Sequence, residues 1–354
     1  RDVARLLGEL KHEGVQGVVV DLRNNGGGSL AEANSLTGLF IDKGPVVQVR
    51  DSKGHVEEQG DDDPGMAWSG PLAVLVNRGT ASASEIFSAA IQDYHRGLII
   101  GEPTFGKGTV QNLVDLDRFA QGDSEKPQLG ELKMTIQEFF RINGGSTQLK
   151  GVTPDIAFPK NGDDKDFGES TYDNALKWTQ IAPADYQTVA NLNAYLSQLQ
   201  QKHDERVARS PAWKLMLDEL AQYRTMRAKT SVSLNFAARE VERKQQEAIQ
   251  ADFRARHKAI DGTDASLADE ASSLDDGLNA NERSLKSELK QEKEAKKAKD
   301  VQLNETAHIL FDAVGMIKAD PQLASEVLPY GGKFSPHAVA SVAAPAPAAS
   351  SATH

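Results

Sequence analysis

The sequence predicts an α/β core followed by an all-α region, and three observations support this prediction. Up to about residue 180, short apolar runs alternate with segments of helical spacing, which is typical of strands buried in a parallel sheet between helices. From about residue 184, the chain changes to long, charged segments with helical apolar spacing. Residues 338–354 form a low-complexity tract of Ala, Pro and Ser, which predicts disorder. We therefore expect a core over 1–183, a helical C-terminal domain over 184–335 and a disordered tail over 336–354.

The predicted core opens with a helix and continues as alternating strands and helices. Val3, Leu6, Leu7 and Leu10 recur at helical spacing. Strands are predicted at 15–22, 46–49, 71–76 and 98–100, with helices at 30–40 and 83–94. A further extended strand is predicted at 129–142, and the polar stretch 51–70 predicts a hairpin or a surface loop.

The second half of the chain predicts long helices over 186–201, 211–229 and much of 233–258. Residues 280–299 are dominated by Glu, Lys and small residues, with few large apolar side chains. This composition predicts a solvated helix with ion pairs one turn apart. The alternative is a helix that docks on a partner or on another domain.

Composition and charge exclude several classes of function. The net charge is -11 and the pI is near 5.3, so we expect no binding to nucleic acid or to an anionic membrane face. Cysteine is absent, which rules out disulfides, thiolate zinc sites and a cysteine nucleophile. Because no apolar run approaches the roughly 18–20 residues that cross a bilayer, we expect no transmembrane segment. The chain opens inside a predicted helix, so we expect a fragment of a longer protein.

The first candidate site segment is DLRNNGGG at residues 21–28, directly after a predicted strand. Its glycines permit positive φ and close approach of the main chain to a ligand, and successive N–H groups can bind an anion. A flexible strand-to-helix turn is the alternative. The glycine spacings of dinucleotide-binding and nucleoside triphosphate loops are missing.

The second segment is GTASASEIF at residues 79–87, where small residues lead from a predicted strand into a helix. A serine here lies at the helix N-terminus, whose N–H groups would stabilise an oxyanion formed beside it. The alternative is that Ser82 or Ser84 only caps the helix.

The third segment, GEPTFGKGTVQ at residues 101–111, places Lys107 between two glycines and near apolar residues. Burial would lower its pKa by the roughly 3 units that a general base near neutral pH needs; the alternative is an ordinary surface lysine. A histidine base is the rival, but His95 would lie about 20 Å from Ser82 along one helix. Asp93 would lie about 16 Å away by the same measure, which favours a structural role near the helix end.

In this order and at these spacings, the three segments resemble the carboxy-terminal processing (tail-specific) peptidases, over residues 1 to about 155 and weakly at TSVSLN (230–235). The resemblance implies that Ser82 is the nucleophile, Lys107 the general base and Gln111 the residue that orients the lysine. It places the oxyanion hole on the main-chain N–H groups of Gly28 and Ala83. Asp93 matches an aspartate that has been considered a third catalytic member, and the distance argument discounts it.

The resemblance also implies a ClpP/crotonase-like core, truncated at its N-terminus, and a serine endopeptidase that needs no metal or cofactor. The implied substrates are proteins with apolar, unstructured C-terminal tails, and an adaptor lipoprotein is a further implied partner. The implied location is the periplasm, either free or on the periplasmic side of the inner membrane. The family carries a PDZ-like substrate-binding domain upstream, so we expect this fragment to lack it. The alternatives are a Ser–Lys amidase and a non-catalytic scaffold or binding fragment.

Overall fold

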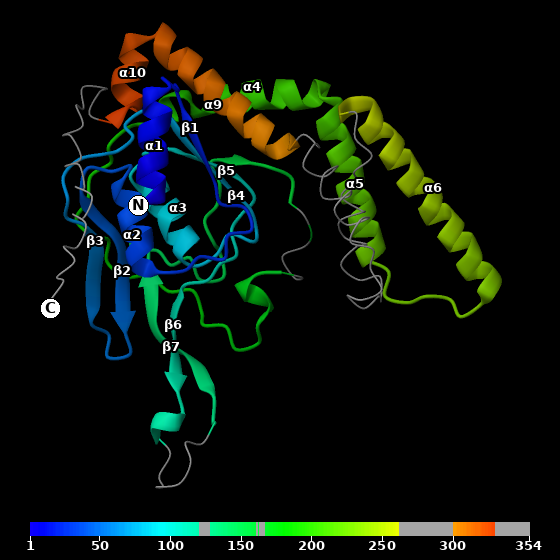
Figure 1. The fold of residues 1–354 in the computed structure, drawn as a ribbon, viewed down its shortest axis with the longest axis horizontal. Coiled ribbons are helices and arrows are strands. Elements are labelled where there is room, and N and C mark those ends of the chain that lie inside the picture. The colour runs from blue at the N-terminus through cyan, green and yellow to red at the C-terminus, as the bar shows by residue number, and fades with distance from the viewer. Residues whose placement is uncertain (120–127, 161, 163–166, 262–299, 330–354) are drawn as a thin grey trace, which may run out of the picture.

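The computed structural model describes residues 1–119, 128–160, 162, 167–261 and 300–329, and Figure 1 shows the arrangement of their helices and strands. The predictions for residues 280–299 and for the tail at 336–354 lie outside these residues. In the described ranges, no helix combines the length and the apolar character that a membrane span requires.

A four-stranded parallel sheet forms the centre of the N-terminal half. Its order is β1 (Val18–Asp21), β4 (Leu72–Val76), β5 (Leu98–Gly101) and β8 (Ile156–Ala157). All five residues of β4 are buried, because this strand has sheet neighbours on both sides and helices above and below. The strands predicted at 15–22, 71–76 and 98–100 are thus confirmed, the first two with shorter bounds and the third extended to Gly101.

A second, antiparallel sheet lies beside the first. Its order is β3 (Val56–Asp61), β2 (Gly44–Asp51), β7 (Glu131–Phe140) and β6 (Thr109–Asp115). The assignment of residues 46–49 to a parallel sheet was wrong, because a run buried on both faces does not distinguish parallel from antiparallel pairing. The hairpin predicted within 51–70 is β2–β3. Strands β6 and β7 run out from the body as a two-stranded ribbon (Figure 1), and a short 3₁₀ turn, Asp117–Phe119, follows β6.

Three helices cover the sheets in the N-terminal half: α1 (Asp2–His12), α2 (Leu30–Gly38) and α3 (Ala83–Asp93). Helix α3 is buried over nearly its whole length. Phe87 on α3 meets Phe40 edge-to-face in the core shared with the parallel sheet, and Ile86 on its other side joins the core under the antiparallel sheet. Helix α3 therefore lies between the two sheets, and its N-terminus is held from both sides.

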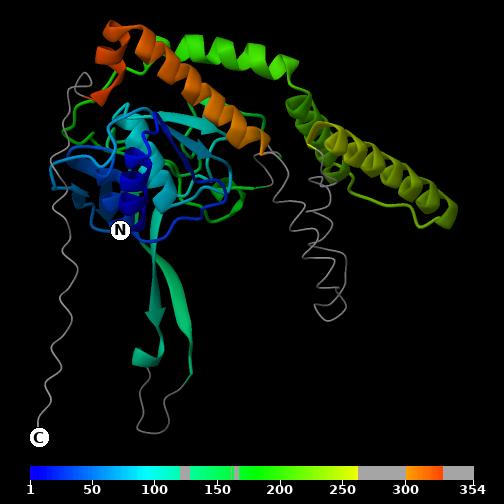
Figure 2. The same ribbon diagram turned by 45° about the horizontal axis from the view of Figure 1, so that its top comes forward.

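The C-terminal half is helical, as predicted. After a 3₁₀ turn at Glu169–Thr171, it contains α4 (Asn193–Arg209), α5 (Pro211–Arg227), α6 (Phe236–Asp261), α9 (Val301–Ala319) and α10 (Pro321–Val327). Helix α4 begins later than the helix predicted at 186–201, whereas α6, from Phe236 to Asp261, confirms the helix predicted over much of 233–258. Figure 2 shows α5 and α6 extending away from the sheets, whereas α9 crosses over them.

Helix α9 completes the core of the parallel sheet. Ile309 and Ala313 are fully buried against a cluster that includes Ala73 and Leu75 of β4. The same cluster takes in Trp213 of α5 and residues of α4 and α10. One face of the sheet is therefore covered by helices of the C-terminal half, and α9 begins more than 200 positions after β4 ends. The boundary predicted at 183/184 stays a prediction.

Candidate active site

The three segments singled out in the sequence follow three neighbouring strands of the parallel sheet, β1, β4 and β5. The carboxyl ends of parallel strands meet at one edge of a sheet, which is where α/β proteins place their sites. Main-chain hydrogen bonds join the loops there: Ala81 donates to Asn25 at 3.0 Å and Phe105 donates to Thr80 at 2.9 Å. The structure thus brings together what the sequence spreads over about 90 residues.

Ser82 occupies the N-cap position of α3, at the sharp turn that follows β4. Its main chain has φ 58° and ψ -118°, a conformation that costs a non-glycine residue about 1–3 kcal/mol and that clusters at functional sites. The helix N-terminus directs its partial positive charge at this position. The turn therefore holds the Ser82 hydroxyl where main-chain N–H groups can stabilise an anion beside it.

Glu85, three residues after Ser82, joins the serine and lysine loops. Its Oε2 accepts the main-chain N–H of Ser82 at 2.8 Å and that of Lys107 at 3.0 Å. Its Oε1 accepts the Thr104 hydroxyl at 2.6 Å and the Gly106 N–H at 2.7 Å. The main-chain nitrogens of Ser82 and Lys107 therefore lie within about 6 Å of each other, the most that two such hydrogen bonds to one oxygen allow.

The Glu85 side chain is fully buried, and this burial raises its pKa from 4.5 to about 7, although the four hydrogen bonds act in the opposite direction. Glu85 was not among the predicted site residues, although its sequence position carries a signal: Ser at the N-cap followed by Glu three residues later is a capping box.

Lys107 is half-buried on the loop between β5 and β6. Burial and the positive charge of Lys133 lower its pKa below the usual value, while Glu169 and Glu85 act in the opposite direction. Its carbonyl accepts the Thr147 hydroxyl at 2.8 Å, so the loop is fixed on both sides of the lysine. In the described part of the chain, no hydrogen bond joins the Lys107 ammonium to the Ser82 hydroxyl. The environment matches the sequence-based expectation of a lysine with a lowered pKa.

The glycine loop after β1 lies directly against the Ser82 turn. Gly27 has φ 87° and donates its N–H to the Asn25 side chain at 3.0 Å. A Cβ on Gly27 would stand 2.7 Å from the Ala83 nitrogen. Gly28 lies one residue further along and is exposed. The loop thus places main-chain groups beside the predicted Ala83 donor, and Gly27 makes the close approach that the sequence analysis did not assign.

Gln111 lies on β6, four residues after Lys107, with its side chain exposed. The pairing of β6 with β7 shifts register between Val110 and Gln111, which places an additional β7 residue opposite this point and increases the local twist. The orienting role of Gln111 stays a prediction.

Asp93 is the last residue of α3, at the opposite end of the helix from Ser82. Its carboxylate accepts a forked pair of hydrogen bonds from Arg141, at 2.5 and 3.1 Å, and a third from Asn143 at 2.8 Å. The side chain is buried, so Asp93 ties the end of α3 to the segment after β7. His95 lies beyond the end of the helix, also away from Ser82.

We expect Asp93→Asn to lower stability and to spare the chemistry. The change leaves the partly buried Arg141 without its carboxylate, which costs about 3 kcal/mol in the free energy of unfolding. Urea unfolding measures this loss, and active-site titration normalises the remaining activity to the folded fraction. Activity abolished in a fully folded Asp93→Asn protein would contradict this assignment and give Asp93 a catalytic role.

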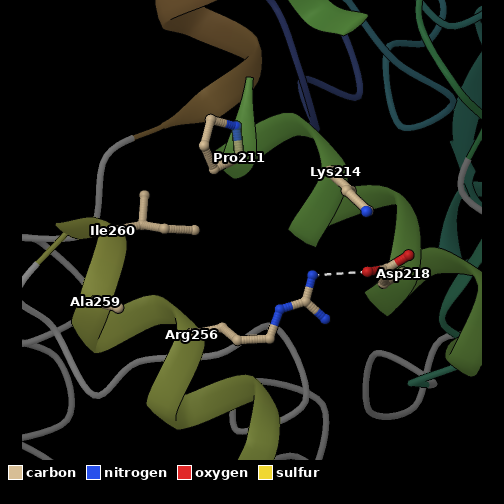
Figure 3. Close-up of a pocket in the computed structure, with 6 residues that line it drawn as sticks. All are labelled: Pro211, Lys214, Asp218, Arg256, Ala259 and Ile260. Carbon is tan, nitrogen blue, oxygen red and sulfur yellow. Dashed lines mark hydrogen bonds and ion pairs between the residues drawn. The ribbon is translucent and has the colours of Figure 1, made fainter. Parts of the chain in front are cut away.

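A separate pocket lies between α5 and α6, away from the three loops (Figure 3). Pro211, Lys214, Asp218, Arg256, Ala259 and Ile260 line it. Asp218 already pairs with Arg256 at 2.6 Å, and neither helix carries any of the three segments. Across the described ranges, no group of three or more His, Asp or Glu side chains could hold a metal ion.

The two halves of the chain match different family models. Residues 1–158 match the model of peptidase family S41, and residues 162–315 match the model of the C-terminal domain of tail specific protease. The chain is 47% identical over 245 residues to the tail-specific protease of Haemophilus influenzae, covering 68% of this chain and 35% of that protein. It is 39% identical over 148 residues to the chloroplastic C-terminal processing peptidase of Tetradesmus obliquus, covering 42% of this chain and 30% of that protein.

Among solved structures, the photosystem II D1 C-terminal processing protease is 35% identical, with a TM-score of 0.37, and the match covers 44% of this chain and 38% of that one. The chain spans about a third of the length of the curated relatives named above, 35% and 30%. Through residues 1–158 the chain belongs to peptidase family S41, and the region that follows is the C-terminal domain of tail-specific proteases.

Proposed function

We propose that this chain carries the catalytic site of a serine endopeptidase in which Ser82 is the nucleophile and Lys107 the general base. One observation carries the proposal: a single buried carboxylate, Glu85, binds the main chains of both residues. A capping glutamate alone would need only the Ser82 N–H. Holding the lysine loop with the same oxygen fixes the positions of a nucleophile and a base with respect to each other.

In the proposed reaction, the neutral Lys107 amine removes the proton from the Ser82 hydroxyl as its oxygen attacks the substrate carbonyl carbon. The carbonyl oxygen becomes negative and is stabilised by the main-chain N–H groups of Ala83 and Gly28. The intermediate collapses to an ester on Ser82, and the departing amine takes the proton from Lys107. Water then gives a proton to Lys107 and attacks the ester carbonyl carbon. The bond to the Ser82 oxygen breaks as Lys107 returns the proton to that oxygen, which releases the new C-terminus and restores both residues. Gln111 orients the lysine.

The proposed substrate is an extended polypeptide with an apolar, unstructured C-terminal tail. Strand β6 starts two residues after Lys107 and is an edge strand of its sheet. An edge strand offers main-chain hydrogen bonds to a peptide that adds to the sheet, and exposed apolar residues such as Leu113 lie along it. The similarity to a bacterial protein named tail-specific protease favours tails as the substrate. An adaptor lipoprotein as a partner and the periplasm as the location are proposed from the resemblance of the three motifs alone.

The full-length protein tests the pair directly. A fluorophosphonate should label Ser82 in the wild type, and Ser82→Ala should remove both the labelling and the cleavage of a protein with an apolar tail. Lys107→Ala should reduce both by at least about a thousandfold, because the hydroxyl loses its base. The matched control is Lys150→Ala, a lysine of a nearby loop that stacks on Trp178 at 3.7 Å. Cleavage that persists in Lys107→Ala would overturn the Ser–Lys mechanism.

The same experiment separates the two alternatives. An amidase would hydrolyse small amides and leave the tailed protein intact. A scaffold would bind the tailed protein, with Ser82 unlabelled and no cleavage.

A further inference from the structure

Arg23, in the glycine loop, makes an ion pair with the C-terminal helical region. Its guanidinium donates to both carboxylate oxygens of Asp300, with a distance of 3.1 Å from Nη1 to Oδ1. The same guanidinium also donates to Asp21, the last residue of β1, with a distance of 2.6 Å from Nη2 to Oδ2. Arg23 thus bridges two carboxylates that lie 279 residues apart in the sequence, and a planar guanidinium holds two such partners in a fixed geometry.

Asp300 is itself held firmly. It is the N-cap residue of α9, and its Oδ1 also accepts the Leu303 N–H at 2.9 Å. About two and a half and three and a half turns further along, Ile309 and Ala313 of the same helix are fully buried against the parallel sheet. The carboxylate that meets Arg23 is therefore attached to the core and is not the end of a free surface helix.

From Arg23, hydrogen bonds continue to the Ser82 turn. The next residue, Asn24, has φ 57° and exchanges hydrogen bonds with Asn77 at 2.9 and 3.0 Å. Asn25 accepts the Ser84 hydroxyl at 2.9 Å on its side chain and the Ala81 N–H at 3.0 Å on its carbonyl. Asn24 and Asn25, the two residues after Arg23, thus both bind residues between 77 and 84, the stretch that carries Ser82.

We infer that Asp300 positions the glycine loop for the reaction through Arg23, so that the C-terminal helical domain contributes to catalysis as well as to stability. The inference rests on the proposed function, because it assumes that the glycine loop contributes main-chain donors to an oxyanion at Ser82. Asp300 and Arg23 are positioning residues: neither needs to touch the substrate. The Asp300 side chain is 39% exposed and that of Arg23 is 19% exposed, so the expected effect is moderate.

The test uses Asp300→Asn in the full-length protein. Asparagine caps a helix as well as aspartate does, so the variant keeps α9 and removes only the charge that binds Arg23. Asp320→Asn is the matched control, because Asp320 is the N-cap of α10 in the same region and accepts N–H groups of its own helix at 2.9 and 3.2 Å. The rate of fluorophosphonate labelling at Ser82 and the separate values of kcat and KM are the readouts.

We expect Asp300→Asn to lower the labelling rate and kcat about tenfold with KM unchanged, and Arg23→Gln to have a similar effect. The double variant should be no slower than the Arg23 variant alone, because both changes break one link. The midpoint of urea unfolding should move equally in Asp300→Asn and Asp320→Asn, whereas only the first should slow the chemistry. Labelling of Asp300→Asn within about twofold of the wild type, or fully additive effects in the double variant, would overturn the inference.

Amide hydrogen exchange keeps this test separate from that of the proposed function. If Ser82 is not labelled even in the wild type, the proposed function fails, and exchange at the main-chain N–H groups of residues 24–28 still reports the link. The link predicts faster exchange there in Asp300→Asn than in Asp320→Asn. Equal exchange in the two variants would overturn it.

Discussion

Replacing Glu85 with glutamine is expected to lower kcat/KM by about a hundredfold or more at pH values near 8, because the change breaks the contact that holds Ser82 and Lys107 together. Glu85 accepts four hydrogen bonds, two on each oxygen. Glutamine has the same shape, but only one of its two terminal atoms accepts. Whichever way the amide turns, its NH₂ group faces two donors, and two buried donors lose their partner at about 1–3 kcal/mol each.

The raised pKa of Glu85 predicts that the stability of the protein depends on pH. Burial raises its pKa from 4.5 to about 7 in the folded protein. The folded state therefore binds this proton more tightly than the unfolded state does, and the unfolding free energy falls as pH rises between these values. The contribution of Glu85 is fully present below about pH 4.5 and is lost above about pH 7, a change of roughly 3 kcal/mol.

The same titration acts on activity in the opposite direction. A protonated Glu85 has one oxygen that donates, so the carboxyl group can no longer accept all four hydrogen bonds. The Lys107 amine must also be neutral to act as a base, and its lowered pKa increases the neutral fraction. Both groups therefore predict activity that rises with pH, while the contribution of Glu85 to stability falls. Above about pH 7 the protein therefore holds an ionised carboxylate buried at the site, although ionisation lowers its stability.

Urea unfolding of the wild type and of Glu85→Gln, measured from about pH 4.5 to 8, tests this account, because the difference between the two curves isolates the titration of Glu85. The control is Glu219→Gln, a buried glutamate of α5 that pairs with His257 at 2.8 Å, far from the three loops. It should lower stability and leave kcat/KM per folded molecule unchanged. A Glu85→Gln protein that folds and retains full activity would contradict the proposed role of the carboxylate.

The sequence allowed the prediction of the strands of the parallel sheet and of the loops that follow them, because both leave local patterns. An apolar run such as 71–76 predicts a buried strand. A glycine-rich turn directly after such a strand predicts a loop at the edge of the sheet where sites form. The family and the α/β core with its helical C-terminal region are confirmed. Gly28 and Ala83 as donors, and Gln111 as the orienting residue, stay predictions.

What the sequence did not indicate depends on contacts between distant residues. Glu85 has three partners on the loop about 20 residues later, and the local capping-box pattern does not point to these contacts. The contact of Arg23 with Asp300 spans 277 positions, so neither residue carries a pattern that points to the other. The direction of strand pairing also could not be predicted from the sequence. The run at 46–49 is mostly apolar because both of its faces are covered, and this holds for parallel and antiparallel neighbours alike.

Replacing Gly27 with alanine is expected to lower kcat at least about a hundredfold, whereas Gly26→Ala should be tolerated. A Cβ at position 27 would stand 2.6 Å from the Ala81 oxygen and 2.7 Å from the Ala83 nitrogen. Both atoms belong to the main chain of the Ser82 turn, so a rotamer change cannot relieve the clash. The φ of 87° adds strain for any residue with a Cβ. At Gly26 no atom lies within 4 Å of the added Cβ, and φ is not positive.

The mechanism of the loss distinguishes this change from simple unfolding. If the loop retreats from Ala83 to make room, the oxyanion loses its main-chain donors, and removing one such donor costs about 10²–10³ in kcat. We therefore expect Gly27→Ala to bind a tailed substrate with nearly the wild-type KM and to turn it over at least about a hundredfold more slowly.

Far-ultraviolet circular dichroism of Gly26→Ala and Gly27→Ala should be alike, because the loop is exposed and lies outside the sheets. Equal loss of activity in both variants would mean that the loss does not come from the close approach of Gly27 to Ala83. Full activity in Gly27→Ala would mean that the donors beside Ser82 come from elsewhere. Loss of activity in Gly27→Ala alone would support the prediction that the main chain of the glycine loop must contact the Ser82 turn.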